Sequence, residues 1–194
     1  MKAILLLATL KKDRPSNTEA LCRFFTDKLD SKGILHETIK LVDYNIPPGT
    51  YSRMKEDDQW PAIQDKILES DLVIFATPVW WNNHSSLMQR AIERLDELHD
   101  HLMEGKPSGL EGKAGGIIVT GDSDGAMGVI SGIANFYNAI GIAFPPFASL
   151  TVLWDRQAKG TETPEAALLE KYKKDYSAVA DKMIDSLLST VKRQ

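Results

Sequence analysis

Two consecutive tryptophans stand two residues after a proline, close to the point where a strongly apolar stretch of the chain ends. The stretch is Asp71–Ala76, and the segment that follows it, Thr77–Asn83, reads TPVWWNN. Indole rings at the exposed end of a strand offer a flat apolar face to a ring system, while backbone amides beside them reach its polar atoms. Alternatively, one or both rings pack against a helix or a second subunit. The pattern predicts one wall of a site for a planar ligand.

A second candidate segment carries hydroxyl, amide and basic side chains from Thr9 to Thr18 and runs into a predicted helix. Free N–H groups and the helix dipole favour an anion at such a helix start. The segment has neither a dinucleotide fingerprint nor a Walker loop, so the anion it suits is a single phosphate monoester. The alternative is a capping box, in which Glu19 reaches back to Ser16. Both interpretations stay open on this segment alone.

A third candidate segment, Gly121–Gly125, reads GDSDG and follows another predicted strand. Its glycines let the backbone approach a ligand closely, and its acidic and hydroxyl residues suit the start of a helix. The alternative is a plain turn with an Asp or Ser cap.

The histidines and the single cysteine do not form a catalytic or metal-binding pattern. His99 and His101 lie two residues apart on a predicted helix, so their side chains diverge, and we expect both to be solvated. His84 adjoins the tryptophan segment, where it either contacts a substrate or packs at a helix start. Cys22 is expected to be a small core residue, and one cysteine excludes a disulfide framework. We assign no catalytic side chain and no metal site.

The composition points to one globular domain covering residues 1–194, with 43% hydrophobic residues. A net charge of −4 gives no electrostatic footprint for nucleic acid. No apolar stretch approaches the roughly 20 residues that span a bilayer, and the run Ala3–Ala8 is too short for a signal peptide. We therefore expect a cytoplasmic protein with no nucleic-acid or membrane partner.

Strands and helices alternate along the chain, which is typical of an α/β fold. We expect strands at 3–8, 34–42, 71–76, 116–120 and 148–154. Helices are expected at 18–31, 61–70, 85–101, through 130–140, and after Thr163-Pro164. Each connection contains a helix, so the pattern predicts a doubly wound five-stranded parallel sheet. All three candidate segments leave carboxyl ends of strands, where such sheets bind ligands.

The longest irregular segment is Asp43–Gln59, and loops of this length in compact domains are usually functional. Tyr51 and Trp60 look exposed in the sequence, and we expect the segment Tyr44–Trp60 to contribute to the site of a neighbouring subunit. Asp57 and Asp58 are expected at a turn and helix start, where acidic groups suit the dipole.

Together these residues resemble the NAD(P)H-dependent FMN reductase family of the flavodoxin superfamily. The resemblance rests on Asp71–Asn82, with Leu87-Met88 and Ile92-Glu93-Arg94 further along. Ser16–Ala20 is similar to the phosphate loop of that family, and the turn beginning Gly121-Asp122 to its third flavin-contacting segment. The resemblance covers essentially the whole chain and is strongest from Asp57 to Leu95. It implies a flavodoxin-like sheet with strand order 2-1-3-4-5.

The resemblance also implies a set of FMN contacts. The phosphate would be held by Thr9, Lys11, Ser16, Asn17 and Thr18. The flavin ring would be bordered on one side by Pro78, Val79, Trp80, Trp81 and Asn82. The other side of the flavin site would be closed by Gly121, Asp122 and Gly125. One branch of the family carries an iron–sulfur cluster on cysteines in the segment that corresponds to Asp43–Gln59. That segment has no cysteine here, which places the chain in the branch without a cluster.

The function implied is an FMN-dependent NAD(P)H oxidoreductase. Reducing equivalents would pass to a small-molecule acceptor such as a quinone, a free flavin, or a nitro- or azo-aromatic compound. Two alternatives are a flavodoxin-type electron carrier and a cofactor-free regulatory or binding module. The family's sites often lie at subunit interfaces, so we expect a homodimer or a homotetramer.

Overall fold

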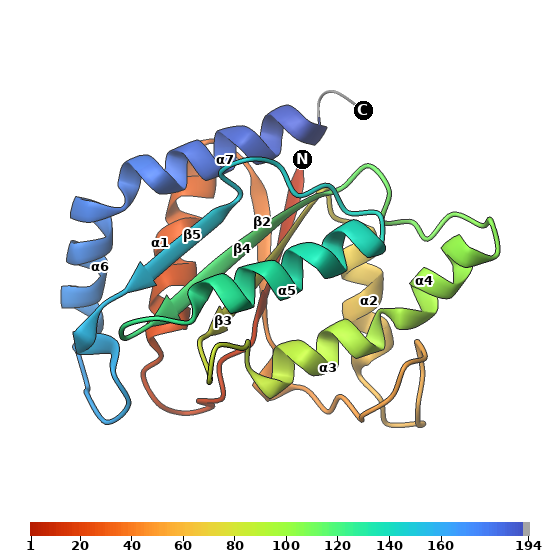
Figure 1. Ribbon diagram of the computed structural model, residues 1–194, viewed down its shortest axis with the longest axis horizontal. Coiled ribbons are helices and arrows are strands. Elements are labelled where there is room, and N and C mark those ends of the chain that lie inside the picture. Colours follow the sequence, from red (N-terminus) through yellow and green to blue (C-terminus); the bar gives the residue numbers. More distant parts are fainter. Residues whose placement is uncertain (192–194) are drawn as a thin grey trace.

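Five parallel strands form one sheet in the computed structural model, which describes residues 1–191 (Figure 1). They are β1 (Lys2–Leu7), β2 (Leu35–Lys40), β3 (Leu72–Pro78), β4 (Ala114–Gly121) and β5 (Ser149–Leu153). Their spatial order is β2-β1-β3-β4-β5, and every neighbouring pair is parallel. The predicted fold and strand order are confirmed. The carboxyl ends of all the strands therefore meet at one edge of the sheet.

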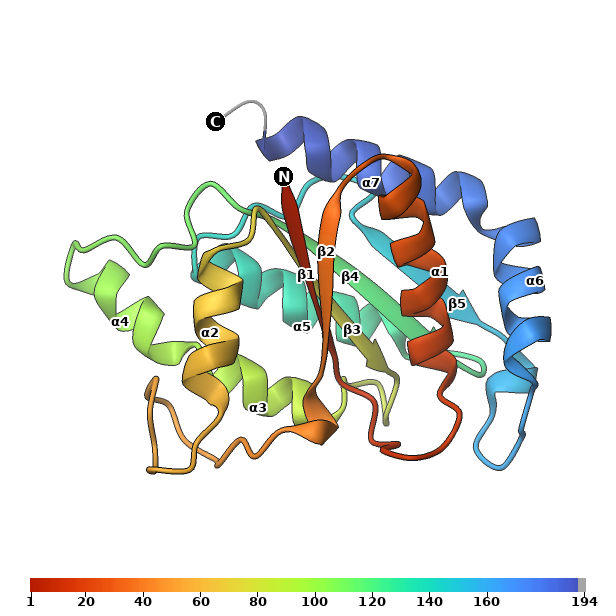
Figure 2. The same cartoon turned by 180° about the vertical axis from the view of Figure 1, so that it is seen from behind.

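Helices cover both faces of the sheet (Figures 1 and 2). The elements α1 (Asn17–Ser31), α6 (Glu165–Asp175) and α7 (Ser177–Val191) lie on one face. The other face carries α2 (Trp60–Leu68), α3 (Ser86–Arg94), α4 (Asp96–Met103) and α5 (Ala126–Ala139). Two short 3₁₀ helices, η1 (Leu41–Asp43) and η2 (Asp155–Gln157), follow β2 and β5. Within residues 1–191, no helix is long and apolar enough to cross a bilayer.

The central strands are buried on both faces, which explains their unbroken apolar sequences. In β1, Leu5 and Leu7 pack in the layer under α1 and α7, whereas Ile4 and Leu6 pack toward α2 and α3. β2 is an edge strand, and its side chains are mostly exposed or half-buried. Two cores thus enclose the sheet and fix the edge at which the loops gather.

Two of the predicted helices are each divided in the structure. The helix expected at 85–101 breaks at Leu95 between α3 and α4, and the final helix breaks at Tyr176 between α6 and α7. At the first break, the backbone N–H of Glu97 donates to the carbonyl of Thr50 (3.2 Å). A contact with a distant segment therefore replaces the local helical bond, which periodicity alone does not reveal.

A buried ion pair anchors the long segment between η1 and α2. Arg94 and Asp58 have fully buried side chains, with Nη2 of Arg94 2.6 Å from Oδ2 of Asp58. Burial alone would raise the pKa of Asp58. The Arg94 guanidinium and the amides of Met54 and Trp60, however, hold this pKa below its usual value. Asp58 also accepts from the first backbone amide of α2, at Trp60 (2.9 Å), as expected for an acidic group at a helix start.

The expectation that Trp60 is exposed is wrong. Its ring is completely buried, and its indole N–H lies within hydrogen-bonding distance of Gln64 Oε1 (3.0 Å) and Arg94 O (3.1 Å). The Arg94 guanidinium also lies over the ring, 5.7 Å from its centroid. Tyr51 is exposed, as expected.

Candidate functional site

A cavity of about 640 Å³ opens at the carboxyl edge of the sheet, where four loops meet. Every residue predicted to hold the ligand lines this cavity except Gly125. The predicted lining residues are Thr9, Lys11, Ser16, Asn17, Thr18, Pro78, Val79, Trp80, Trp81, Asn82, Gly121 and Asp122. Leu10, Thr120, Ser123, Asp124 and the segment 157–160 complete the wall. The volume is in the range of small-molecule and cofactor sites.

The first wall is the loop between β1 and α1, which ends at the N-cap residue Ser16. The Ser16 hydroxyl accepts from the amide of Glu19 (3.3 Å) and donates to Thr9 Oγ1 (2.9 Å). Within residues 1–191, the amides of Asn17 and Thr18 have no backbone or side-chain acceptor. Two free N–H groups thus remain at the start of α1, where the dipole favours an anion.

The capping-box alternative is confirmed at Ser16 but not at Glu19. The Glu19 carboxylate does not return to Ser16 but pairs with Nζ of Lys40, 3.0 Å away at the end of β2. The charge of Lys40 competes with the neutral N–H of Ser16, and a charge-assisted bond is the stronger of the two. Ser16 therefore caps the helix without reciprocal support.

The second wall is a tight hairpin after β3. The backbones of Trp80 and Asn83 exchange two hydrogen bonds (2.7 and 2.8 Å), and the two residues between them have positive φ, 48° at Trp81 and 64° at Asn82. This is the geometry of a type I′ turn, which glycine and asparagine prefer. Trp81 is 92% exposed and Trp80 38% exposed. Neither ring is buried against the rest of the chain.

β3 continues through Pro78, two residues beyond the end expected at Ala76. Pro78 pairs with Thr120 of β4, and the pairing of β1 with β3 has already ended at Leu7 and Ala76. The amide of Val79 donates to Thr120 (2.8 Å), so the face of Pro78 that lacks an N–H looks toward β1. A proline is tolerated there because no ladder bond is lost.

Ser85 joins the first two walls. Its amide donates to Thr77 Oγ1 (2.9 Å), and its hydroxyl donates to the carbonyl of Ala8 at the end of β1 (2.6 Å). The same hydroxyl caps α3 by accepting from Met88 (3.3 Å). The hairpin is therefore held in register with the β1–α1 loop.

The third wall, between β4 and α5, packs directly on the hairpin. A Cβ at Gly125 would lie 2.6 Å from Asn82 Oδ1, and one at Gly128 would lie 2.2 Å from the Asn82 carbonyl oxygen. Gly125 also has a φ of +82°. Gly125 thus stands behind Val79 and Asn82 instead of lining the cavity. A buried bond between the hydroxyls of Thr18 and Thr120 (2.7 Å) ties this wall to α1.

A fourth wall, formed by Gln157–Gly160 after β5, was not among the predicted segments. Figure 2 shows the loop after β5 close to the loop after β1. The Asn17 side-chain amide donates to the carbonyl of Gln157 (3.4 Å), which connects the two. The sequence held a signal for this wall, because the loop leaves the carboxyl end of a predicted parallel strand as the other three do.

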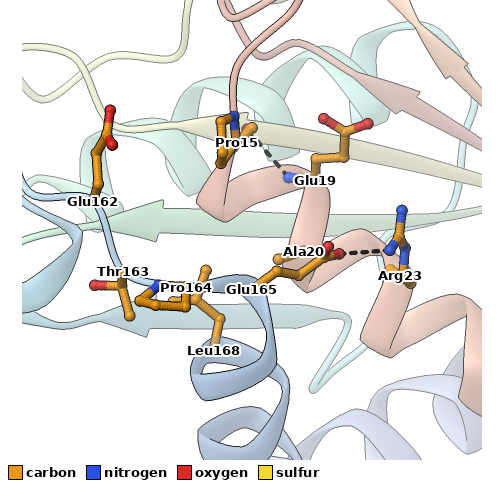
Figure 3. Close-up of a pocket in the computed structure, with 10 residues that line it drawn as sticks. Pro15, Glu19, Ala20, Arg23, Glu162, Thr163, Pro164, Glu165 and Leu168 are labelled. Carbon is orange, nitrogen blue, oxygen red and sulfur yellow. Dashed lines mark hydrogen bonds and ion pairs between the residues drawn. The ribbon is translucent and has the colours of Figure 1, made fainter.

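A second cavity of about 390 Å³ lies between α1 and the start of α6 (Figure 3). Its lining includes the carboxylates of Glu19, Glu162 and Glu165. Glu165 pairs with Arg23 (2.7 Å), as Figure 3 shows, and Glu19 pairs with Lys40. Most of its charge is thus already neutralised, and we assign the ligand site to the larger cavity.

The remaining candidates stay outside the larger cavity. His84 contacts the carbonyl of Ser85 (3.3 Å) at the start of α3, and His99 and His101 are half-buried on α4. In the part of the chain that the structure describes, no three His, Cys, Asp or Glu side chains gather as a metal site. Cys22 is buried in the core as expected, and burial raises the pKa of its thiol.

Curated relatives of this chain include three proteins of different description. An 8-demethyl-8-aminoriboflavin-5′-phosphate synthase from Streptomyces davaonensis is 26% identical over 159 residues, covering 77% of this chain and 62% of that protein. An FMN-dependent NADPH-azoreductase from Staphylococcus aureus is 27% identical over 123 residues, covering 61% and 63%. A divalent metal cation transporter MntH from Mycobacterium bovis is 29% identical over 153 residues, covering 76% and 22%. The chain thus spans less than two thirds of each relative.

Solved structures share the fold. The crystal structure of RosB with the bound intermediate 8-demethyl-8-formylriboflavin-5′-phosphate has a TM-score of 0.79 at 22% identity, covering 100% of this chain and 79% of that one. The model of the family described as NADPH-dependent FMN reductase matches residues 1–152. That description names the flavin and the nicotinamide expected from the sequence. The chain belongs to the NADPH-dependent FMN reductase family.

Proposed function

We propose that this chain is an FMN-dependent NAD(P)H oxidoreductase that reduces a quinone, a flavin, or a nitro- or azo-aromatic acceptor. The proposal rests mainly on one observation: the cavity at the carboxyl edge joins a helix start with free amides to an exposed aromatic hairpin. The name of the Staphylococcus aureus relative, an azoreductase, supports an aromatic acceptor.

The residues present fit FMN. The free amides of Asn17 and Thr18, the Thr9 hydroxyl and the Lys11 ammonium suit a phosphate monoester. Pro78 and Val79 offer an apolar border for the ring system, and the cavity is large enough for a mononucleotide. FMN, when bound, supplies the hydride-accepting chemistry. The chain's own part is to position the ring and to shield it from water.

No side chain is needed as a general acid or base in this proposal. His84 is directed to the backbone of Ser85 and does not line the cavity. Trp81 and Asn82 line the cavity, and within residues 1–191 their backbone amides have no acceptor, so they would be available to polar edges of the ring. Preorganised backbone donors of this kind stabilise developing negative charge without a titrating group.

We further propose that residues 1–194 act as a single FMN-binding domain in a homodimer or homotetramer. Tyr51 is 58% exposed on the segment held by Arg94, which suits a contact with a neighbouring subunit. Light scattering checks this assembly, and a monomer at all concentrations would contradict it.

The test of the function begins with an absorbance spectrum of the purified protein, loaded with FMN if necessary. We expect a flavin spectrum and oxidation of NADPH or NADH when a quinone or an azo dye is added. A protein that FMN cannot reconstitute would rule the proposal out. The flavin should be recovered unchanged after turnover. A modified flavin would instead favour chemistry on the flavin itself, as in the name of the Streptomyces davaonensis relative.

A further inference from the structure

The fourth wall of the cavity lies beyond the part of the chain that the family model matches. That match ends at residue 152, whereas the wall is formed by Gln157, Ala158, Lys159 and Gly160. The other three walls lie inside the matched region. The fourth wall thus lies outside the region that the family model matches, and the sequence pattern of the family does not describe it.

A partly buried network holds the wall against the sheet. The Gln157 carboxamide satisfies its partners when its oxygen accepts from the Tyr172 hydroxyl and its nitrogen donates to the carbonyls of Gly121 and Val152, each at 3.1 Å. The Tyr172 hydroxyl also lies 3.4 Å from the carbonyl of Asn17. Tyr172 is completely buried, and its ring packs beside Phe24 of α1. The network thus connects β4, β5, α1 and α6 beneath the cavity.

The far end of the same loop is anchored as well. The Thr163 hydroxyl donates to the carbonyl of Arg156 (2.7 Å), and Glu165 pairs with Arg23 of α1 (2.7 Å; Figure 3). The short segment between these anchors carries Lys159, which lines the cavity and takes part in no ion pair within residues 1–191.

The position of the wall favours a phosphate as the partner of this lysine. Gln157, two residues before Lys159, accepts from the Asn17 side chain at the start of α1. The amides of Asn17 and Thr18 are without acceptors in the described chain. A cation that shares a cavity with free helix-start amides suits an anion that the helix dipole also attracts.

We propose that Lys159 contacts the phosphate monoester of FMN and that Gln157 and Tyr172 are positioning residues that hold Lys159 in place. This inference rests on the proposed function, because it takes FMN as the ligand. A phosphate monoester also occurs as the 2′-phosphate of NADPH. The bond between Gln157 and Asn17 holds the loop of Lys159 beside the start of α1, where the FMN phosphate is expected, and so favours that phosphate. The experiment below distinguishes the FMN phosphate from the 2′-phosphate of NADPH.

The first test measures the dissociation constants of FMN and riboflavin by flavin fluorescence, using Lys159→Gln and the control Lys173→Gln. Lys173 is exposed on α6 and does not line the cavity. We expect Lys159→Gln to weaken FMN about 3- to 10-fold, the scale of a charge-assisted contact near a surface. Riboflavin lacks the phosphate, so its affinity should stay the same. Lys173→Gln should change neither.

Three results would overturn the inference. Unchanged FMN affinity in Lys159→Gln would show that Lys159 does not contact FMN. Equal weakening of FMN and riboflavin binding would show that the contact is not with the phosphate. A rise in KM for NADPH but not NADH, with FMN affinity unchanged, assigns the lysine to the 2′-phosphate. If the unaltered protein binds no FMN, the proposed function fails instead, so the two failures are distinguishable.

The positioning role is tested with a double-mutant cycle of Tyr172→Phe and Lys159→Gln. Tyr172→Phe keeps the ring and removes the hydroxyl, and we expect it to weaken FMN about 2- to 4-fold only while Lys159 is present. A purely structural effect would weaken FMN equally in both backgrounds and would overturn the positioning role. Gln157→Ala provides the same comparison from the other side of the network, should Tyr172→Phe fold poorly.

Discussion

Arg94 directs every polar atom of its guanidinium toward one segment of the chain. Nε donates to the carbonyl of Tyr51 (2.8 Å), Nη1 to that of Pro47 (3.1 Å), and Nη2 to that of Ser52 (3.0 Å) and to Asp58 (2.6 Å). A segment without regular structure therefore has its backbone carbonyls satisfied by a side chain. Arg94 is thus a main anchor of this segment, together with Arg90, whose Nη1 donates to the carbonyl of Ile46 (3.1 Å).

We predict that Arg94→Met lowers the free energy of unfolding by about 3–5 kcal/mol, because it leaves the Asp58 carboxylate buried and unpaired. The control is Lys171→Met, which breaks the partly exposed pair with Asp175. Such pairs contribute about 0–1 kcal/mol. Urea unfolding of both variants measures the difference. Similar losses in the two variants would contradict this account of Arg94.

Asp58 also predicts how stability changes in acid. Its pKa in the folded protein lies below the ordinary value of 3.8, so its contribution is complete above pH 3.8 and is lost as the pH falls through the lowered pKa. We expect Asp58→Asn to lower the free energy of unfolding at neutral pH. Below pH 3.8 the variant should lose less further stability than the unaltered protein. Unfolding at several pH values measures this. Parallel acid profiles of the two proteins would count against it.

Trp81 is held in the left-handed region, at φ 48°, where only glycine is free of strain. Because its ring is exposed, we expect Trp81→Gly to leave the free energy of unfolding unchanged or to raise it by up to about 1 kcal/mol. The KM for an aromatic acceptor should rise if the ring borders the acceptor. Denaturant unfolding and steady-state kinetics check the two effects. A clear loss of stability would show that the indole packs.

At the scale of elements, the hairpin after β3 packs closely against the start of α5. Gly128 has the Asn82 carbonyl where a Cβ would lie, at 2.2 Å, whereas Gly132, one turn later on α5, has open space there. The same chemical change therefore has opposite consequences at two positions of one helix. The distance of each glycine from the hairpin, and not its helix propensity, determines whether alanine is tolerated there.

We predict that Gly128→Ala displaces the hairpin and weakens FMN binding about 10-fold or more, because the cavity loses its second wall. Gly132→Ala should leave FMN binding unchanged and stabilise the protein by about 0.5–1 kcal/mol, the gain in helix propensity. Flavin titration and thermal unfolding measure both. Equal FMN affinity in the two variants would contradict the packing role of Gly128.

The sequence predicted the elements better than their interruptions. Unbroken apolar runs identified the buried strands, and the helical connections required these strands to be parallel. Three of the site loops could therefore be predicted from the sequence alone. The break at Leu95 and the burial of Trp60 could not, because both depend on contacts of Arg94 and Glu97 with a distant irregular segment. The wall at Gln157–Gly160 was missed although its strand was predicted, since its residues lack glycine-rich or aromatic character.

In the whole molecule, two cores lie on either side of the sheet, and the site loops lie at its carboxyl edge. The cavity lies at the edge that neither helical layer covers, and each wall is tied to a different strand. A ligand that contacts all four walls would connect both layers. The site and the global fold are therefore coupled through the sheet.

We predict that FMN at about 100 times its dissociation constant raises the free energy of unfolding by about 2.7 kcal/mol. For a chain of this size that corresponds to a Tm increase of about 5–11 °C. Riboflavin at the same concentration should raise the Tm less, since it lacks the phosphate. Thermal unfolding followed by circular dichroism measures the shift. No shift with FMN would favour a cofactor-free binding module.

The double anchoring of the β5–α6 loop has a consequence for how this fold can be re-engineered. Gln157 fixes one end of the loop and the Arg23–Glu165 pair fixes the other, so the intervening residues close a short loop. Doubling the length of a flexible loop costs only about 0.6 kcal/mol of chain entropy. Insertions after Gly160 would therefore enlarge one wall of the cavity at little thermodynamic cost. The phosphate end of the cavity could be redesigned there without altering the strands that carry the fold.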